Sequence, residues 1–133
     1  KPDRAMVTVR PEDTVLDAIK ILAREDIGAA VVVSGDRLVG IFSERDYTRK
    51  VVLKGRQSET TKVEEIMTAN VVCVSPRTKT RDCMAIMSEK NIRHLPVVEE
   101  GRVVGMVSIR DIVTDIIADQ DFTISQLEQY IVS

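Results

Sequence analysis

Two stretches of the chain repeat one another, and they decide the fold. Residues 7–46 read VTVRPEDTVLDAIKILAREDIGAAVVVSGDRLVGIFSERD, and residues 72–111 read VCVSPRTKTRDCMAIMSEKNIRHLPVVEEGRVVGMVSIRD. A shift of 65 positions aligns them without a gap, and 14 of the 40 aligned positions hold identical residues. This period is too long for a solenoid unit and indicates a duplicated half-domain. Because a unit of roughly 60 residues buries little surface, we expect the two halves to share one core.

Each copy predicts the element order β-α-β-β-α. A short alternating strand (residues 7–9 and 72–74) is followed by a helix, and a hairpin then leads into a second helix. The first helix has apolar or small residues at helical spacing: Val15, Ala18, Ile19 and Leu22 in one copy, and Thr80, Cys83, Met84 and Met87 in the other. The hairpin strands are expected at residues 29–33 and 38–42, and at 95–98 and 103–107. The final helices begin at Ser43 and Ser108. The fold class is therefore mixed α/β (α+β), with two repeats related by pseudo-twofold symmetry.

The repeats also set the expected domain boundaries. We place the first repeat at residues 1–60, the second at residues 61–120 and a helical tail at residues 121–133, where Ile124, Leu127 and Ile131 form an apolar stripe. That stripe could pack on the domain or on a partner subunit. Thr61 and Glu64 have the spacing of a capping box and predict a short helix that runs to Met67. An equivalent helix would precede residue 1, which suggests a trimmed start.

Composition excludes several classes of protein. The 133 residues include 19 Lys and Arg against 21 Asp and Glu, so no net positive charge is available to grip a nucleic-acid backbone. Four aromatic residues are too few for a platform on which bases stack. The longest apolar run, residues 29–33, is far shorter than the about 20 residues of a membrane span. Two cysteines make no disulfide framework, so a reducing, cytoplasmic location is expected.

The candidate ligand-binding residues lie at the two junctions between a hairpin and the helix that follows it. They read GIFSERD (residues 40–46) and GMVSIRD (residues 105–111). A helix N-terminus and an Arg side chain suit phosphate, an Asp carboxylate can accept both hydroxyls of a ribose diol, and Gly lets a flat ring approach the backbone. A structural explanation remains open, because Ser-x-x-Asp at a helix start is itself a capping box. Both roles can hold together.

These two motifs resemble the glycine–apolar–x–Ser/Thr–x–x–Asp signature of cystathionine β-synthase (CBS) domains, and the whole repeat resembles a tandem CBS pair, the Bateman module. The resemblance implies a regulatory module, not an enzyme, with no catalytic cofactor and no metal. It would bind an adenine nucleotide (AMP, ADP, ATP or NAD) in two inter-repeat clefts and signal to an unidentified partner protein. It also implies a homodimer.

Carried over residue by residue, the resemblance implies one cleft made by Ser43, Arg45 and Asp46 with Val74, Ile92, Arg93, His94, Leu95 and Pro96. The other cleft combines Ser108, Arg110 and Asp111 with Val9, Ile27, Gly28, Ala29, Ala30 and Val31. Asp46 and Asp111 would hold ribose, the two serines would lie near phosphate, and aliphatic strand residues would enclose the adenine.

The two clefts differ in charge. The first gains Arg93 and His94 where the other has Gly28 and Ala29, and Arg49 and Lys50 follow the first motif where Thr114 and Asp115 follow the second. We therefore expect the first cleft to bind phosphate more strongly. His94, the only histidine, could contact phosphate or could be a satisfied structural residue, and its charge would depend on pH.

Three classes of function stay open on the residues alone. The first is a nucleotide-responsive regulator, and the second is an interaction or scaffold protein whose clefts are empty. The third is an enzyme such as a cysteine redox protein, although Cys73, Cys83 and His94 do not make a zinc set or a recognisable nucleophile motif. The resemblance favours the first class.

Overall fold

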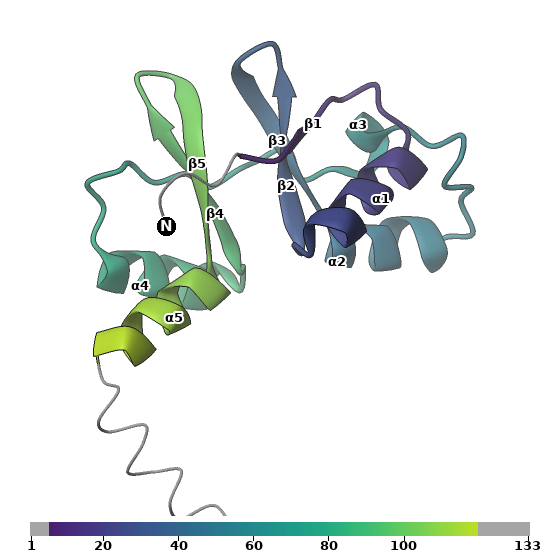
Figure 1. The fold of residues 1–133 in the computed structure, drawn as a ribbon. Helices are drawn as coiled ribbons and strands as arrows, with labels where there is room; N and C mark the ends of the chain where they lie inside the picture. Colours follow the sequence, from purple (N-terminus) through teal and green to yellow (C-terminus); the bar gives the residue numbers. More distant parts are fainter. Residues whose placement is uncertain (1–5, 120–133) are drawn as a thin grey trace, which may run out of the picture.

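The structure, a computed structural model, describes residues 6–119, and the predicted tail at residues 121–133 lies outside that range. The first repeat contains β1 (Thr8–Val9), α1 (Val15–Glu25), β2 (Ala29–Ser34), β3 (Arg37–Ser43), α2 (Glu44–Asp46) and η1 (Tyr47–Val52). After α3 (Val63–Ile66), the second repeat contains α4 (Thr80–Lys90), β4 (His94–Glu99), β5 (Arg102–Ser108) and α5 (Ile109–Asp119). Figure 1 shows the two hairpins side by side with the helices below and around them. The predicted mixed fold of two related repeats is confirmed.

The sheets follow the predicted hairpins. In the first repeat β2 lies between β1, to which it is parallel, and β3, to which it is antiparallel. In the second repeat the sheet has two strands, and β4 is antiparallel to β5. The hairpin turns differ as the shifted glycine indicated. Gly35 alone has a positive φ (67°) in the first turn, whereas Glu100 (51°) and Gly101 (81°) both do in the second.

The strand predicted at residues 72–74 is reduced to a single parallel bridge between Val74 and Val97. The Val74 N–H donates to the Pro96 carbonyl, and the Val98 N–H donates to the Val74 carbonyl. The next bond of such a ladder would run from the backbone nitrogen of residue 96 to Val72. Proline has no N–H, so the ladder ends there.

The helices begin and end for local reasons. The Thr14 hydroxyl accepts from the Asp17 N–H (3.1 Å) at the start of α1, which caps this helix. Asp26 and Asn91 end α1 and α4 in the left-handed conformation, with φ of 54° and 56°. The helical spacing of Met84 and Met87 favours a place in the core for both. Met87 is buried there, but this expectation was wrong for Met84, which is 39% exposed.

The second helix of the first repeat is not a continuous α-helix. One short turn, α2, leads into the π-helix η1, where bonds such as Leu53 N–H to the Thr48 carbonyl (3.0 Å) span five residues. Val51 is buried in the first cluster of core residues, and Tyr47, four positions earlier, packs against it. The equivalent helix of the second repeat, α5, is a regular α-helix.

The expectation of one shared core was wrong, because the buried residues form two clusters. The first cluster contains Val9, Val15, Ala18, Leu22, Ala30, Val32, Phe42, Val51, Val63 and Ile66. The second cluster contains Val74, Cys83, Met87, Leu95 and Ile112. Each hairpin packs against its own helices. The repeats meet where β3 contacts β5 and through the chain that connects them.

The connection between the repeats belongs structurally to the first repeat. Val63 and Ile66 of α3 lie in the first cluster. The Thr61 carbonyl accepts from the Val15 N–H (2.8 Å), so it satisfies one of the unpaired donors at the start of α1. The predicted capping box at Thr61 and Glu64 was wrong. The Thr61 hydroxyl donates to the Gln57 carbonyl instead, and the Lys62 N–H donates to the Glu65 carboxylate (2.8 Å).

Gly40 allows the connection to pass against β3. Ile41 and Thr68 exchange two backbone hydrogen bonds of 2.9 Å. A Cβ atom on Gly40 would lie 2.6 Å from the Met67 sulfur and 3.0 Å from the Thr68 carbonyl oxygen. We had expected Gly40 to admit a flat ligand ring, but its space is taken by the chain between the repeats.

We predict that Gly40→Ala lowers the free energy of unfolding by about 1–3 kcal/mol, because the added methyl group forces the backbone at Thr68 away from β3. Gly105→Ala is the matched control, since among residues 6–119 the nearest atom to its Cβ would be 4.0 Å away. Urea unfolding of both variants measures the difference. Equal stability of the two variants would contradict the tight passage at Gly40.

Candidate functional site

In the described part of the chain, both sequence motifs line one continuous cleft of about 810 Å³ between the repeats. We had expected two separate clefts, but β3 and β5 contact one another, so the ends of the two strands open into the same hollow. The volume lies in the range of small-molecule sites. The predicted residues that line it are Ser43, Arg45, Asp46, Ser108, Arg110, Asp111, Ile27, Gly28, Ala29, Ile92, Arg93 and His94.

The first motif forms a capping box at the end of β3. The Asp46 N–H donates to the Ser43 hydroxyl oxygen (3.1 Å), and the Ser43 N–H donates to Asp46 Oδ2 (3.1 Å). The Ser43 hydroxyl is also 3.0 Å from Oδ2. Ser43 and Asp46 therefore do cap the helix, which is the structural explanation that the sequence left open. Capping alone does not exclude ligand binding by Asp46, since its carboxylate has a second oxygen.

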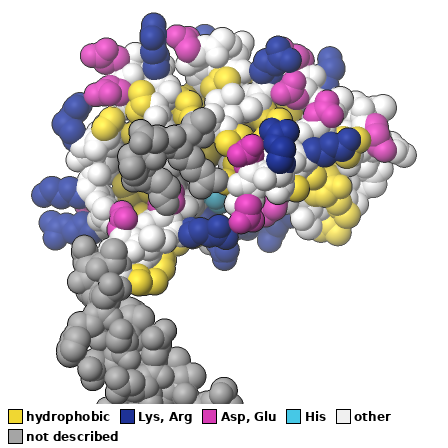
Figure 2. Space-filling view, viewed as in Figure 1, with side chains coloured by type: hydrophobic (Ala, Val, Ile, Leu, Met, Phe, Trp, Pro, Cys, Tyr) yellow, Lys and Arg dark blue, Asp and Glu magenta, His cyan; other side chains and the backbone are white. Residues whose placement is uncertain are grey.

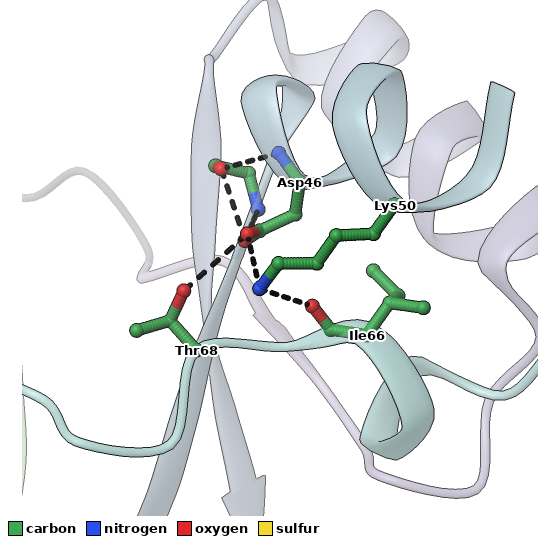
Figure 3. A network of polar contacts seen from close by, with 5 residues as sticks. Asp46, Lys50, Ile66 and Thr68 are labelled. Carbon is green, nitrogen blue, oxygen red and sulfur yellow. Dashed lines mark hydrogen bonds and ion pairs between the residues drawn. The ribbon is translucent and has the colours of Figure 1, made fainter. Parts of the chain in front are cut away.

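Asp46 is at the centre of a polar network (Figure 3). Its other oxygen, Oδ1, accepts from the Thr68 hydroxyl (3.3 Å) and is 3.0 Å from Lys50 Nζ. Lys50 Nζ also donates to the Ile66 carbonyl (3.0 Å). Asp46 is buried, so the ammonium and three further groups offset the cost of burying its charge. The network joins α2, η1, α3 and the connection at Thr68.

The second motif repeats the capping box at the end of β5. The Ser108 N–H donates to Asp111 Oδ2 (2.9 Å), and the Asp111 N–H donates to the Ser108 hydroxyl oxygen (3.1 Å). Asp111 is half-buried, whereas Asp46 is buried. Four residues further along α5 stands Asp115, at the position that Lys50 occupies in the first repeat. The two motifs therefore share their cap and differ in what surrounds the carboxylate.

His94 lies between the two halves of the cleft. It pairs with Ser108 across β4 and β5, and a Cβ atom on Gly28 would be 3.5 Å from its ring. Desolvation by burial lowers the pKa of His94 below its usual 6.5, and the nearby positive charge of Arg93 lowers it further. The charge of Asp111 acts in the opposite direction. The balance is a neutral imidazole at pH 7.

Eight of the predicted site residues do not line the cleft. Val9, Ala30, Val74, Leu95 and Pro96 are buried behind it, and Val31 is likewise buried, so they support its walls rather than face it. Arg49 and Lys50 also lie outside its lining, and the Lys50 ammonium points at Asp46 and Ile66. These two cations therefore give no support to the expectation that the first motif binds phosphate more strongly.

Sequence reasoning missed the contribution of the connection between the repeats. Thr68, Asn70, Val71 and Val72 line the cleft, as do Glu44, Met106 and Ile109. Their signal was weak, because residues 68–71 lie between the predicted short helix, which ends at Met67, and the repeated stretch, and were assigned to no element. The one available hint was Gly40, whose missing side chain admits this segment.

The thiols show no sign of activation. Burial raises the pKa of Cys73, and burial together with the charge of Asp82 raises the pKa of Cys83. A raised pKa keeps a thiol protonated at pH 7 and weakens it as a nucleophile. Within residues 6–119 no group of three or more His, Cys, Asp or Glu side chains is placed to hold a metal ion.

Two further predictions concern the absence of a basic surface for nucleic acid and the absence of a membrane-spanning helix. On the face shown in Figure 2, acidic and basic side chains of the described residues are interspersed. None of the helices in residues 6–119 has both the length and the apolar character needed to cross a bilayer.

Comparison with known proteins identifies the family. The family model of the CBS domain matches the chain twice, at residues 2–53 and at residues 63–118. The chain belongs to the CBS-domain family. A protein with CBS domains from Burkholderia ambifaria MC40-6 has a similar structure, with a TM-score of 0.86, 53% identity and coverage of 90% of both chains.

Two other CBS proteins are informative. CBSX3, a mitochondrial CBS domain-containing protein of Arabidopsis thaliana, is 41% identical over 90% of this chain, and the chain spans 61% of its length. Because that relative is mitochondrial, the cytoplasmic location expected here stays a prediction. The CBS domain pair of protein MJ0100, solved in complex with 5′-methylthioadenosine and S-adenosyl-L-methionine, is 29% identical. It has a TM-score of 0.78 over 86% of this chain and 93% of that one.

We predict that His94 makes stability depend on pH. Its folded pKa is lowered, so the unfolded chain binds more protons below pH 6.5 and stability falls as pH decreases through that region. His94→Gln removes this contribution. Urea unfolding across the pH range should therefore show a smaller loss for the variant than for the wild type on going from pH 7.5 to about pH 5. An equal or larger loss in the variant would contradict the assignment.

Proposed function

We propose that the cleft binds an adenosine-containing ligand, such as AMP, ADP, ATP or NAD, and that occupancy regulates a partner protein. The observation that carries the proposal is the half-buried Asp111 carboxylate, which lines a cleft of nucleotide size at the start of α5. A carboxylate only accepts hydrogen bonds at neutral pH, and the 2′ and 3′ hydroxyls of ribose are two adjacent donors.

The remaining lining fits the other parts of such a ligand. Ile27, Ile92 and Ile109 offer aliphatic walls for a flat purine. Arg93 and Arg110 are exposed cations on the same cleft, and guanidinium groups pair well with phosphate oxygens. The adenosine ligands in the complex of the MJ0100 pair support the same ligand class for this chain.

Regulation follows if the ligand binds one arrangement of the repeats more tightly than another. The cleft is lined from both repeats, whereas each repeat has its own core, so a bound ligand bridges two separately packed units. The output is proposed to be non-catalytic and the partner is a protein still to be identified. A homodimer and a cytoplasmic location remain part of this proposal.

The capping boxes favour one alternative, an interaction module without a physiological nucleotide. Asp46 and Asp111 each already accept the N–H of their own serine. If that is their whole role, the fold presents surfaces to partners and its cleft has no ligand.

Calorimetric titration with AMP separates the two functions. We predict binding to the wild type and at least a tenfold loss of affinity in Asp111→Asn, which keeps an oxygen for the cap and loses the charge. A charge-assisted hydrogen bond contributes about 1.5–3 kcal/mol, and each 1.4 kcal/mol is tenfold in affinity.

Asp115→Asn is the matched control, because Asp115 is an exposed carboxylate one turn further along α5 and does not line the cleft. Its affinity should equal that of the wild type. Unchanged affinity in Asp111→Asn would contradict the ribose contact. Absence of heat with AMP, ADP, ATP, NAD and S-adenosyl-L-methionine would favour the interaction module.

A further inference from the structure

We infer that two copies of the chain associate crosswise, with the helical segment that follows the first motif of one copy packed on α5 of the other. Each copy then uses both segments, so the assembly closes as a symmetric dimer. This pairing rests on the homodimer in the proposed function and goes beyond it, because it assigns the interface and states which repeat meets which.

Exposed apolar side chains gather on these two segments. Among residues 6–119 seven large apolar side chains are exposed, and four of them lie here. Val52 (54% exposed) ends η1 and Leu53 (72%) follows it, while Val113 (45%) and Ile117 (40%) lie one turn apart on α5. The 65-residue shift aligns Val52 with Ile117, so both repeats expose an apolar residue at the same point.

These four side chains do not fill the core of either repeat. Other positions of the same segments do so, with Val51 in the first cluster and Ile112 in the second. A helix whose outer side meets only water carries polar or small residues there. The helix α1 has that character, and its exposed residues are Asp17, Lys20, Ala23 and Arg24. The apolar outer residues of η1 and α5 therefore indicate a covering partner.

Both segments lie on the same side of the molecule. In Figure 1 the segment that starts with α2 and the helix α5 are both below the hairpins, at the end opposite the hairpin turns. A second copy can therefore touch both at once. A stable dimer covers about 800 Å² and roughly 20–30 residues on each copy, which is more than either segment has alone.

The charges of the two segments are opposite. Residues 44–56 contain five basic and two acidic residues, whereas the aligned residues 109–121 contain one basic and four acidic ones. In the described part of the chain, Arg49 and Lys54 are exposed near Val52 and Leu53 in sequence, and Asp115 is exposed on α5. None of these three charged side chains forms an ion pair with another of residues 6–119.

These charges decide between two ways of closing the dimer. Pairing like with like sets the two basic segments against each other and the two acidic segments against each other, so repulsion opposes it. Crosswise pairing sets each basic segment against an acidic one. Both arrangements cover the same apolar side chains, so the electrostatic difference favours the crosswise one.

The first test is the dissociation constant of the dimer, measured by analytical ultracentrifugation of the full chain. We expect Asp115→Lys to raise it at least about tenfold, because the new cation meets the basic segment of the second copy and acts twice in a symmetric dimer. Adding Arg49→Glu and Lys54→Glu to Asp115→Lys makes the charges opposite again and should restore tight association. Asp36→Lys is the matched control, since Asp36 lies at a hairpin turn and its ion pair with Arg102 is exposed and weak. It should leave the constant unchanged.

A second measurement identifies the neighbours directly. Val52→Cys and Ile117→Cys are made as separate variants with Cys73→Ser, because Cys73 is exposed, whereas Cys83 is buried. One variant carries a size tag, and a short bifunctional thiol reagent is added to each variant alone and to their mixture. We expect cross-linked dimers in the mixture, joined between positions 52 and 117, and none in either variant alone.

The outcomes separate the pairing from the proposed function. Cross-links within each variant alone, a dimeric mixture without cross-links, a dimer that Asp115→Lys does not weaken, or a folded triple variant that stays dissociated would overturn the crosswise pairing and leave the homodimer and the ligand proposal standing. A wild-type chain that stays monomeric would overturn the pairing and the homodimer together. It would assign the apolar residues to another occupant, such as residues 120–133 or a different protein, and AMP titration would still test the ligand.

Discussion

The close passage of the inter-repeat chain along β3 is the constraint on which the rest of the site depends. Ile41 and Thr68 exchange two backbone hydrogen bonds, and the space for this pairing exists only because residue 40 has no side chain. The passage sets Thr68 against Asp46 and brings residues 70–72 into the cleft. It also starts the second repeat beside the first. Together with the contact between β3 and β5, it fixes how the two hairpins lie against one another.

The same residue types serve folding and binding in this chain. Serine and aspartate at each strand-to-helix junction satisfy one another's backbone groups, which is the ordinary work of a helix cap. A cap uses part of a carboxylate, so the surroundings decide whether the remainder can take a ligand. Around Asp46 those surroundings are Thr68 and Lys50, which use the remainder.

The repeat made most of the fold predictable, because its hydrophobic spacing and turn residues occur twice in the same register. The hairpins, the starts of the helices and the residues of both junctions follow from it. What could not be predicted depends on contacts between distant segments. Examples are the π-helix at Tyr47–Val52, the packing of Ile66 in the first cluster and the ladder that ends at Pro96. The direction of Lys50 is the most consequential of these, because a cation near a candidate phosphate site suggests binding until its partner is known.

The central claim is that an adenosine ligand sits in the cleft between two separately packed repeats, with its ribose on Asp111. A crystal structure of the chain grown in saturating AMP tests it most directly. The account predicts AMP in the cleft, with the ribose hydroxyls within hydrogen-bond distance of the Asp111 carboxylate and the purine among the aliphatic side chains of the cleft. A structure in which both aspartates contact only their own serines and neighbouring protein groups, with no purine in the cleft, would contradict it.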